Sequence, residues 1–371
     1  MTPLKDQLFN DQTVAQLAAE HARGIDGFDA VRFTKDALGG FPERELMARM
    51  EWLADCLEPQ LSADFSVMAD QLEAAMPPPL SLDKTDDDFG HFIHAIPGIL
   101  AARHGLVHHR ARAMALLHAA TQRFSMEFAI RSFLLRWPEE TLADLAQWVA
   151  DPNYHVRRLV SEGTRPRLPW GNAVRLQPEQ TLPLLEVLHA DPARFVTRSV
   201  ANHLNDLCRI DPDAVLAHLA QWREQGAQSQ AELDWMRRHA LRNLIKQGHS
   251  GALAAMGYRA DAVINAEVVL EAWQIPMDGT LAFKVVLECA QDMPILVDYR
   301  IEFPRANGKT VQKVFKLKTS RIKGGVPLEV TKRHVFKPDA TTFKLFEGLH
   351  KITVQVNGCD VACAAFTLTK E

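Results

Sequence analysis

Carboxylates and arginines recur one helical turn apart in two segments of this 371-residue chain. Arg158 precedes Glu162 by four positions, and Arg198 precedes Asn202 and Asp206 by four and eight positions. Side chains at this spacing share one face of a helix. Arginine makes forked contacts with phosphate or carboxylate groups, and a carboxylate favours a neighbouring cation. The pattern indicates either local ion pairs on a solvated face or a functional face for a charged ligand.

These side chains lie in a segment that repeats every 40 residues, with copies at 151–165, 191–205 and, more weakly, 231–245. The first two copies begin with Asp-Pro ahead of an apolar and basic helix. Each copy has an arginine at the same point: Arg158, Arg198 and Arg238. A period near 40 predicts stacked helical pairs, because each pair must bury its apolar face on the next. The residue four positions after each arginine varies (Glu162, Asn202, Arg242), so we expect one helix face whose chemistry differs between copies.

The apolar pattern changes near residue 265. Before it, apolar residues recur at helical spacing; after it, short alternating runs and turn dipeptides such as Asn357-Gly358 predict about seven strands. We expect a mostly α fold, with a HEAT-like helical-repeat solenoid over residues 1–262 and a small all-β immunoglobulin-like sandwich over residues 263–371. The clearest strand runs are residues 281–289, 295–303, 310–318, 348–356 and 361–368.

Charge is segregated along the chain. The net charge of -4 combines -11 in residues 1–100 with +4 in residues 101–265 and +3 in residues 266–371. In the middle segment 19 of the 20 basic residues are arginine, and residues 305–337 hold ten basic side chains against one acidic side chain. Two basic regions of this kind could bind a polyanion.

The composition, 47% apolar and 24% charged, is typical of a globular protein. No run of 18 uncharged apolar residues and no secretory signal pattern is present, so we expect a cytoplasmic protein without membrane association. The five cysteines form no paired framework, and Cys359 and Cys363 lack a second ligand pair for zinc, so strand packing is their expected role. We expect no metal and no cofactor.

Three further features each admit two interpretations. Glu127 stands among apolar residues and either pairs with Arg131 or faces a cation that arrives with a ligand. Trp170, between proline and glycine, either covers the core or stacks on a base or sugar. The basic stretch of the second domain is either a solvated edge strand or a clamp on a phosphate backbone. Its candidate contact residues are Lys316, Lys318, Arg321 and Lys323.

The segments RRLVSEGTRPRLPW (157–170) and VTRSVANHLND (196–206) resemble the AlkC branch of the helical-repeat DNA alkylation repair glycosylases. The match is specific over about residues 120–250, and the domain order is similar to that branch over nearly the whole chain. The related AlkD branch lacks the appended domain. The resemblance implies a monofunctional, metal-independent hydrolase of base excision repair. Its expected substrates are cationic N3-alkylated bases, chiefly 3-methyladenine and 3-methylcytosine, in double-stranded DNA, and we expect a monomer.

The resemblance also implies the site. Its carboxylates fall on Glu127, Glu162 and Asp206, and its aromatic residue near the lesion falls on Trp170. N3-alkylation makes the base a good leaving group, so the protein must mainly stabilise the oxocarbenium-like sugar and orient water, which fixed carboxylates can do. The expected substrate and DNA contacts are Trp170, Arg158, Arg165, Arg198, Asn202, Arg238, Lys316, Lys318, Arg321 and Lys323.

Two other classes of function are compatible with a helical repeat. A non-enzymatic scaffold that binds protein or DNA would carry apolar or mixed anchors on its binding face. A metal-dependent nuclease would need ligands at regular spacing, and the histidines show no motif such as His-Glu-x-x-His.

Overall fold

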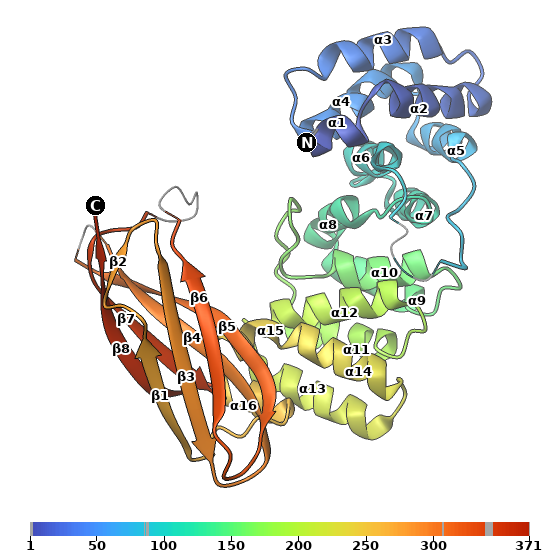
Figure 1. Cartoon of the computed structure of the whole chain (residues 1–371). Helices are drawn as coiled ribbons and strands as arrows, with labels where there is room; N and C mark the ends of the chain where they lie inside the picture. Colours follow the sequence, from blue (N-terminus) through green and yellow to red (C-terminus); the bar gives the residue numbers. More distant parts are fainter. Residues whose placement is uncertain (1–2, 85, 87–88, 306–307, 338–343, 371) are drawn as a thin grey trace. The chain divides into compact units, whose positions relative to one another are not determined.

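The computed structural model describes residues 3–84, 86, 89–305, 308–337 and 344–370. The chain forms two compact units, Met1–Ala240 and Leu241–Glu371 (Figure 1). In the described residues the first unit is helical, and the second contains two short helices followed by strands. The expected order of a helical repeat and a strand domain is therefore confirmed. The first strand begins at Ile264, and a domain division after residue 262 stays a prediction.

The first unit is built from successive layers of helices, from α2 and α3 at one end to α13 and α14 at the other (Figure 1). No described helix is long and apolar enough to span a membrane. The helices are α1 (Leu4–Leu8), α2 (Asp11–Gly24), α3 (Ala30–Gly40), α4 (Leu46–Leu57), α5 (Phe65–Ala75), α6 (Ile96–Leu100), α7 (Arg110–Thr121), α8 (Glu127–Arg136), α9 (Pro138–Trp148), α10 (Tyr154–Gly163), α11 (Pro178–Leu188), α12 (Arg194–Leu207), α13 (Pro212–Gln225) and α14 (Gln230–Ala240). Single turns are η1 (Glu58–Gln60), η2 (Phe92–Ala95) and η3 (Ala101–Gly105).

The repeat copies form α10, α12 and α14, which pack against one another in that order. Each of these Asp-Pro aspartates accepts the backbone amide of the residue just before its helix: Asp151 from Asn153 at 2.7 Å and Asp191 from Ala193 at 2.8 Å. Asp191 also accepts two hydrogen bonds from Arg157 of the preceding copy, at 2.5 and 3.0 Å. Asp191 thus orders the turn before α12 and joins it to the preceding copy.

The third copy departs from the prediction. Helix α14 ends at Ala240, and α15 (Arg242–Lys246) begins after a break at Leu241, whose side chain is fully buried. Arg238 and Arg242 therefore belong to two different helices, which are separated by Leu241. The alternation of charge along one face is confined to the first two copies.

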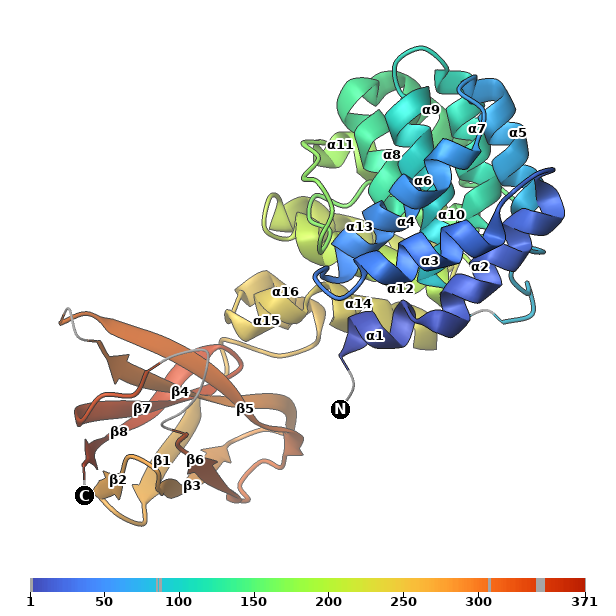
Figure 2. The same cartoon turned by 90° about the horizontal axis from the view of Figure 1, so that it is seen from above.

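The second unit is a two-layer sandwich, in which β4, β5 and β7 separate from β1, β3 and β6 (Figure 2). One sheet has the order β1-β3-β6 and the other β2-β8-β7-β4-β5; all neighbours are antiparallel except β2 and β8. Side chains from both sheets form the core. The elements are α15, α16 (Ser250–Ala255), β1 (Ile264–Leu270), β2 (Gln274–Pro276), β3 (Thr280–Cys289), β4 (Met293–Pro304), β5 (Thr310–Ile322), β6 (Leu328–Val335), β7 (Gly348–Val356) and β8 (Cys359–Thr369).

All five runs named from the sequence are strands, β3, β4, β5, β7 and β8. Asn357 and Gly358 form the β7–β8 turn with φ of 50° and 82°, a conformation that Asn-Gly favours. Strand β5 lies at the edge of its sheet. The packing role expected for Cys359 and Cys363 is wrong, because both are exposed on β8.

Candidate active site

A hollow of about 250 Å³ in the helical unit collects residues from five segments of the chain. They come from the region of η2, from the start of α8 and the residues just before it, from α10, from α12, and from the connection between α10 and α11, which runs beside α8 (Figure 1). Its charged lining residues are Glu127, Arg158, Glu162 and Arg165. Its apolar and aromatic lining residues are Phe89, Phe92, Phe124, Phe128, His155, Leu168, Pro169, Trp170 and Phe195.

Close packing of α8 and α10 positions the two glutamates. Glu127 is the first residue of α8, and Glu162 precedes Gly163, the last residue of α10. A Cβ atom at Gly163 would lie 2.6 Å from a methyl carbon of Ile130, so only glycine lets the two helices approach this closely here. The glycine after Glu162 therefore serves helix packing, which places Glu162 at the end of a tightly packed helix.

Glu127, Arg158, Glu162, Arg165 and Asp206 form one ion-pair network, hereafter the carboxylate cluster. Arg158 lies 2.6 Å from Glu127 and 3.6 Å from Glu162. Arg165 lies 2.6 Å from Glu162 and 2.9 Å from Asp206. Charges of opposite sign thus alternate along the cluster, and each arginine is shared by two carboxylates. Asp206, near the end of α12, is buried and does not line the hollow.

Neutral groups fix the cluster further. The Ser199 hydroxyl donates to Glu162 at 2.7 Å, and the Ser125 hydroxyl donates to Glu127 at 2.8 Å. The Arg158 guanidinium lies 4.7 Å from the ring centroid of Phe195, within cation–π range. Both oxygens of Glu162 are therefore held, Oε1 by Arg165 and Oε2 by Ser199.

Charge and burial set the protonation states. Burial acts to raise the pKa of Glu162, but the Arg158 and Arg165 guanidinium groups and the Ser199 hydroxyl outweigh it and hold the pKa below its ordinary value. Glu162 is therefore an anion at neutral pH. Burial lowers the pKa of His203 to about 3, so His203 is neutral when it donates from Nδ1 to the Ser161 carbonyl at 3.0 Å.

Two of the alternatives left open by the sequence are decided by these contacts. Glu127 does not pair with Arg131; it pairs with Arg158, which lies 31 positions away. Trp170 is not a cover for the core, since it is 65% exposed and lines the hollow. The predicted ion pair between Arg158 and Glu162, four positions apart, is present, but its distance of 3.6 Å is the longest in the cluster.

The remaining expected contact residues of the helical unit are not members of the carboxylate cluster. Arg198 forms an ion pair with Asp86, and Asn202 accepts a hydrogen bond from His239 at 2.8 Å when that ring carries its proton on Nε2. Arg238 is exposed on α14. The neighbouring residues Asp87 and Asp88 lie outside the described part of the chain.

The four basic candidates of the second unit do not belong to the hollow. Lys316 and Lys318 are exposed on β5, Arg321 is exposed near its end, and Lys323 is exposed just after it. They follow the edge strand of the five-stranded sheet. Their proposed contact with DNA stays a prediction. Among the described residues of both units, no group of three or more His, Cys, Asp or Glu side chains is arranged to hold a metal ion.

The chain is similar to known proteins over nearly its whole length. A family model described as a DNA alkylation repair enzyme matches residues 120–244, and one described as the C-terminal Ig-like domain of the uncharacterised protein YhaZ matches residues 265–370. YhaZ of Bacillus subtilis is 33% identical over 367 residues, covering 96% of this chain and 97% of that protein. The Pseudomonas fluorescens alkylpurine DNA glycosylase AlkC, solved with DNA that contains an abasic-site analogue, is also 33% identical. It aligns with a TM-score of 0.84 over 99% of this chain and 100% of that one.

The chain belongs to the AlkC family. Its AlkC-type order of domains follows from two matched regions that divide between residues 244 and 265. The carboxylate cluster lies entirely within the region matched by the alkylation repair model. The expected immunoglobulin-like character of the strand unit is confirmed by the second match.

Sequence reasoning missed three polar residues of the candidate site: Ser199, His203 and Arg131. Ser199 and His203 both lie in the α12 segment that carries the family motif. The helical register could have indicated Ser199, because it follows Arg198 directly and lies on the buried side of α12. Arg131 gave a misleading signal, because its spacing from Glu127 suggested a local ion pair. Its actual partners are backbone carbonyls, which no side-chain pattern reveals.

Proposed function

We propose that this protein is a DNA glycosylase that removes cationic N3-alkylated bases, chiefly 3-methyladenine and 3-methylcytosine, from double-stranded DNA. We further propose that it is a monomeric, metal-independent and monofunctional hydrolase of the cytoplasm. The observation that carries the proposal is the carboxylate cluster beside an aromatic hollow. The full-length similarity to an alkylpurine DNA glycosylase solved with abasic-site DNA supports it.

The chemistry of the substrate matches the cluster. Alkylation at N3 places a positive charge on the base, so the base leaves without a strong acid. As the glycosidic bond breaks, positive charge develops at the sugar carbon C1′. Fixed anions in a poorly hydrated site stabilise that charge without reorganising at the moment of reaction. Aromatic side chains beside the carboxylates favour a flat cation.

Glu162 fits the electrostatic role. Both of its oxygens are held, by Arg165 and Ser199, and its lowered pKa keeps it ionised. A carboxylate of low pKa is a weak base, so proton removal is not its natural task. We assign Glu162 to stabilising the oxocarbenium-like sugar.

Glu127 fits the task of orienting water. It lines the hollow, and its Oε2 accepts hydrogen bonds from Arg158 and Ser125. Within the described residues its other oxygen, Oε1, accepts no hydrogen bond and can therefore bind a water molecule. Asp206 does not line the hollow, and its contact with Arg165 suits it to fixing that guanidinium beneath Glu162.

The arginines divide into two roles on the same reasoning. Arg158 and Arg165 are engaged by carboxylates, with side chains about one-tenth exposed, so we assign them to holding the cluster. Arg198, Arg238 and the basic residues of β5 are more exposed and suit contact with phosphates. Trp170 at the rim suits stacking on the alkylated base or a neighbouring sugar.

The deciding experiment is incubation of methylated duplex DNA with the protein in EDTA, followed by chromatography of the released bases. We expect free 3-methyladenine and abasic DNA. Intact DNA would refute the proposal, as would strand scission that requires added metal ion. A protein-binding scaffold would also leave the DNA intact.

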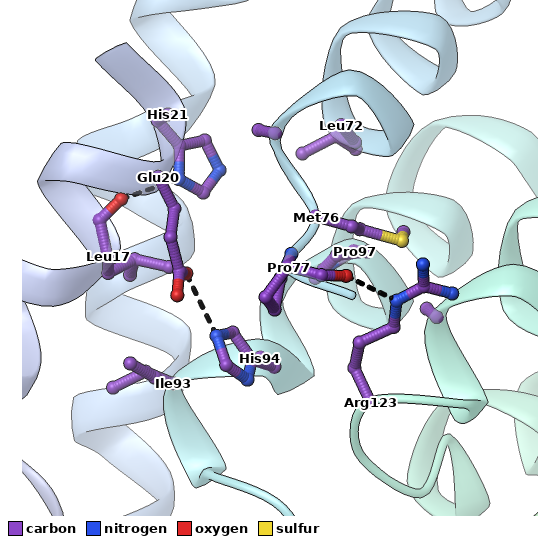
Figure 3. Close-up of a pocket in the computed structure, with 12 residues that line it drawn as sticks. Leu17, Glu20, His21, Leu72, Met76, Pro77, Ile93, His94, Pro97 and Arg123 are labelled. Atoms are coloured by element: carbon purple, nitrogen blue, oxygen red, sulfur yellow. Dashed lines mark hydrogen bonds and ion pairs between the residues drawn. The ribbon is translucent and has the colours of Figure 1, made fainter. Parts of the chain in front are cut away.

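The matched variants are Glu162→Gln and Glu20→Gln. Both glutamates are 5% exposed, but Glu20 pairs with His94 at 2.9 Å and lines a different cavity (Figure 3). Glu162→Gln should slow base release by about 10³-fold, whereas Glu20→Gln should leave it near wild type. Equal losses would mean that any buried glutamate has this effect, and would remove the catalytic assignment.

A further inference from the structure

Arg131 is a fully buried arginine that binds backbone instead of a carboxylate. It lies in α8, is 0% exposed, and forms no ion pair within the described residues. Its Nη1 donates to the carbonyl oxygens of Gly163 at 3.0 Å and Arg165 at 2.8 Å. Its Nε donates to the carbonyl oxygen of Asn172. One guanidinium thus joins the end of α10 to a point seven residues further along the connection to α11.

This arrangement is costly for folding. Burial, and then the charge of Arg165, lowers the pKa of Arg131 to about 10, although the charges of Glu127, Glu162 and Asp206 act to raise it, so the group remains charged at neutral pH. Its Nη2 atom is buried without a hydrogen-bond partner in the described part of the chain. A buried charge with an unsatisfied donor costs free energy that an apolar side chain would avoid. Core packing alone therefore does not account for an arginine at this position.

The backbone held by Arg131 carries two residues of the proposed site. Glu162 immediately precedes Gly163, and Trp170 lies two residues before Asn172. Trp170 has a φ of 61°, a left-handed conformation that is unfavourable for a tryptophan and persists only where the surroundings impose it.

Gly171 allows the guanidinium to reach this loop. A Cβ atom at Gly171 would lie 3.3 Å from Cδ of Arg131 and 3.0 Å from Cδ2 of Leu168. The loop backbone therefore passes directly over the arginine stem.

We propose that Arg131 is a positioning residue that fixes Trp170 relative to Glu162 by clamping the backbone on both sides of the loop. The inference rests on the proposed function and deepens it: Arg131 touches no substrate, and sets the distance between the aromatic wall and the anion that face the alkylated nucleotide. Because Trp170 is 65% exposed, its own side chain has too few contacts to hold this geometry. The hydrogen bonds of Arg131 to the loop backbone therefore hold Trp170 in place where its side-chain packing cannot.

Arg123 provides a matched control. It also donates to backbone carbonyls, those of Pro77 at 2.8 Å and Ala119 at 2.9 Å, and so holds the segment after α5 (Figure 3). It lines the cavity that contains Glu20 and His94, and it is not among the residues that line the hollow beside the carboxylate cluster. Arg123→Met removes the same kind of bond from another place.

The test compares Arg131→Lys with Arg123→Met. Arg131→Lys keeps the positive charge but replaces the fork with one ammonium group, which cannot reach both ends of the loop. We expect the single-turnover rate of 3-methyladenine release to fall about 100-fold, as for a misplaced catalytic group, with little change in Kd for abasic-site DNA. Hydrogen–deuterium exchange should accelerate in peptides covering residues 164–176. Arg123→Met should change neither the rate nor this exchange.

A second variant, Arg131→Ala, tests whether the guanidinium itself matters, because added guanidinium ion should partly restore its rate. An unchanged rate in Arg131→Lys overturns the proposal, as does exchange that is no faster than in wild type. If wild-type protein releases no base, the proposed function fails, and the exchange comparison still decides whether Arg131 clamps the loop. If Arg131→Ala does not fold, Arg131→Lys carries the test.

Discussion

The carboxylate cluster and the basic edge of β5 use charge in opposite ways. In the cluster, Glu162 is buried and its counter-ions Arg158 and Arg165 are about one-tenth exposed, with contacts of 2.6 to 3.6 Å. Along β5, Lys316 and Lys318 are exposed on a strand that has a neighbour on one side only. The fold fixes the charges of the carboxylate cluster in place, whereas the exposed lysines of β5 can adjust their side-chain conformations to a bound ligand.

The difference predicts which steps each region controls. A fixed charge away from water acts strongly over a few ångströms and at one geometry, which suits a transition state. An exposed charge is screened over about 10 Å in 0.1 M salt, so it guides association and adds affinity without demanding a geometry. Changes in the cluster should therefore alter rate or stability, and changes along β5 should alter salt-dependent binding.

The largest effect should come from Glu162→Gln. The amide preserves shape but removes the anion from the proposed sugar-cation site, so we expect the single-turnover rate to fall by about 10³-fold, comparable to the loss of one preorganised electrostatic group. Binding of abasic-site DNA, measured by fluorescence anisotropy, should change little. A variant that loses affinity and keeps its rate would reverse the roles given to the two regions.

Removal of the shared cation should give the next largest effect. Arg165→Met leaves Glu162 and Asp206 buried without the guanidinium that bridges them. We expect a loss of about 3 kcal/mol in the free energy of unfolding, measured in urea, because an uncompensated buried charge remains. The exposed Arg175 of the same connection is the control, and Arg175→Met should change stability by less than about 0.5 kcal/mol. If Arg165→Met and Arg175→Met lower the free energy of unfolding equally, Arg165 does not hold Glu162 and Asp206 in place.

The sequence predicted the architecture because its signals are local. Asp-Pro marked the starts of α10 and α12 through amide contacts two residues away. Alternating runs gave five strands. The five named runs did not include β1, β2 and β6: β2 has only three residues, and β1 and β6 each have a single buried position, Leu270 and Val330.

The sequence indicated which carboxylates belong to the site, but it did not indicate which residues pair with each other. Helical register and the family motif indicated Glu162 and Asp206. The contacts that join separate helices, however, link residues more than 30 positions apart, as in Arg158 with Glu127 and Arg165 with Asp206. Spacing along one helix favoured Arg131 as the partner of Glu127. It could not show that the end of α10 offers carbonyl groups to Arg131 and that Arg158 reaches Glu127 instead.

Lowering the pH should reduce the free energy of unfolding gradually, and by less than Arg165→Met does. The folded pKa of His203 is about 3, below the ordinary 6.5, so the unfolded chain binds more protons. This contribution to stability is full above pH 6.5 and is lost as the pH falls toward 3, at up to about 1.4 kcal/mol per pH unit. The lowered pKa of Glu162 also makes the folded protein less stable as the pH falls, but at lower pH than His203 does.

Urea unfolding at pH 7.5 and 5 measures this loss. His203→Gln should reduce the difference between the two pH values, whereas the exposed His108→Gln should not. A difference that His203→Gln leaves intact would assign the acid sensitivity to another group.

The smallest effect belongs to one residue of the basic edge. Lys318→Gln should weaken binding to duplex DNA a few-fold at low salt and reduce the slope of log K against log salt by about 0.9, the value for one phosphate contact. Lys284→Gln, on β3 of the other sheet, is the control, since Lys284 already pairs with Glu329. If the lysines of β5 serve only to keep an edge strand from associating with other chains, Lys318→Gln will leave the salt slope unchanged and promote aggregation. The two readouts thus separate a binding edge from a protected one, and base release under saturating DNA should stay the same in either case because Lys318 lies outside the cluster.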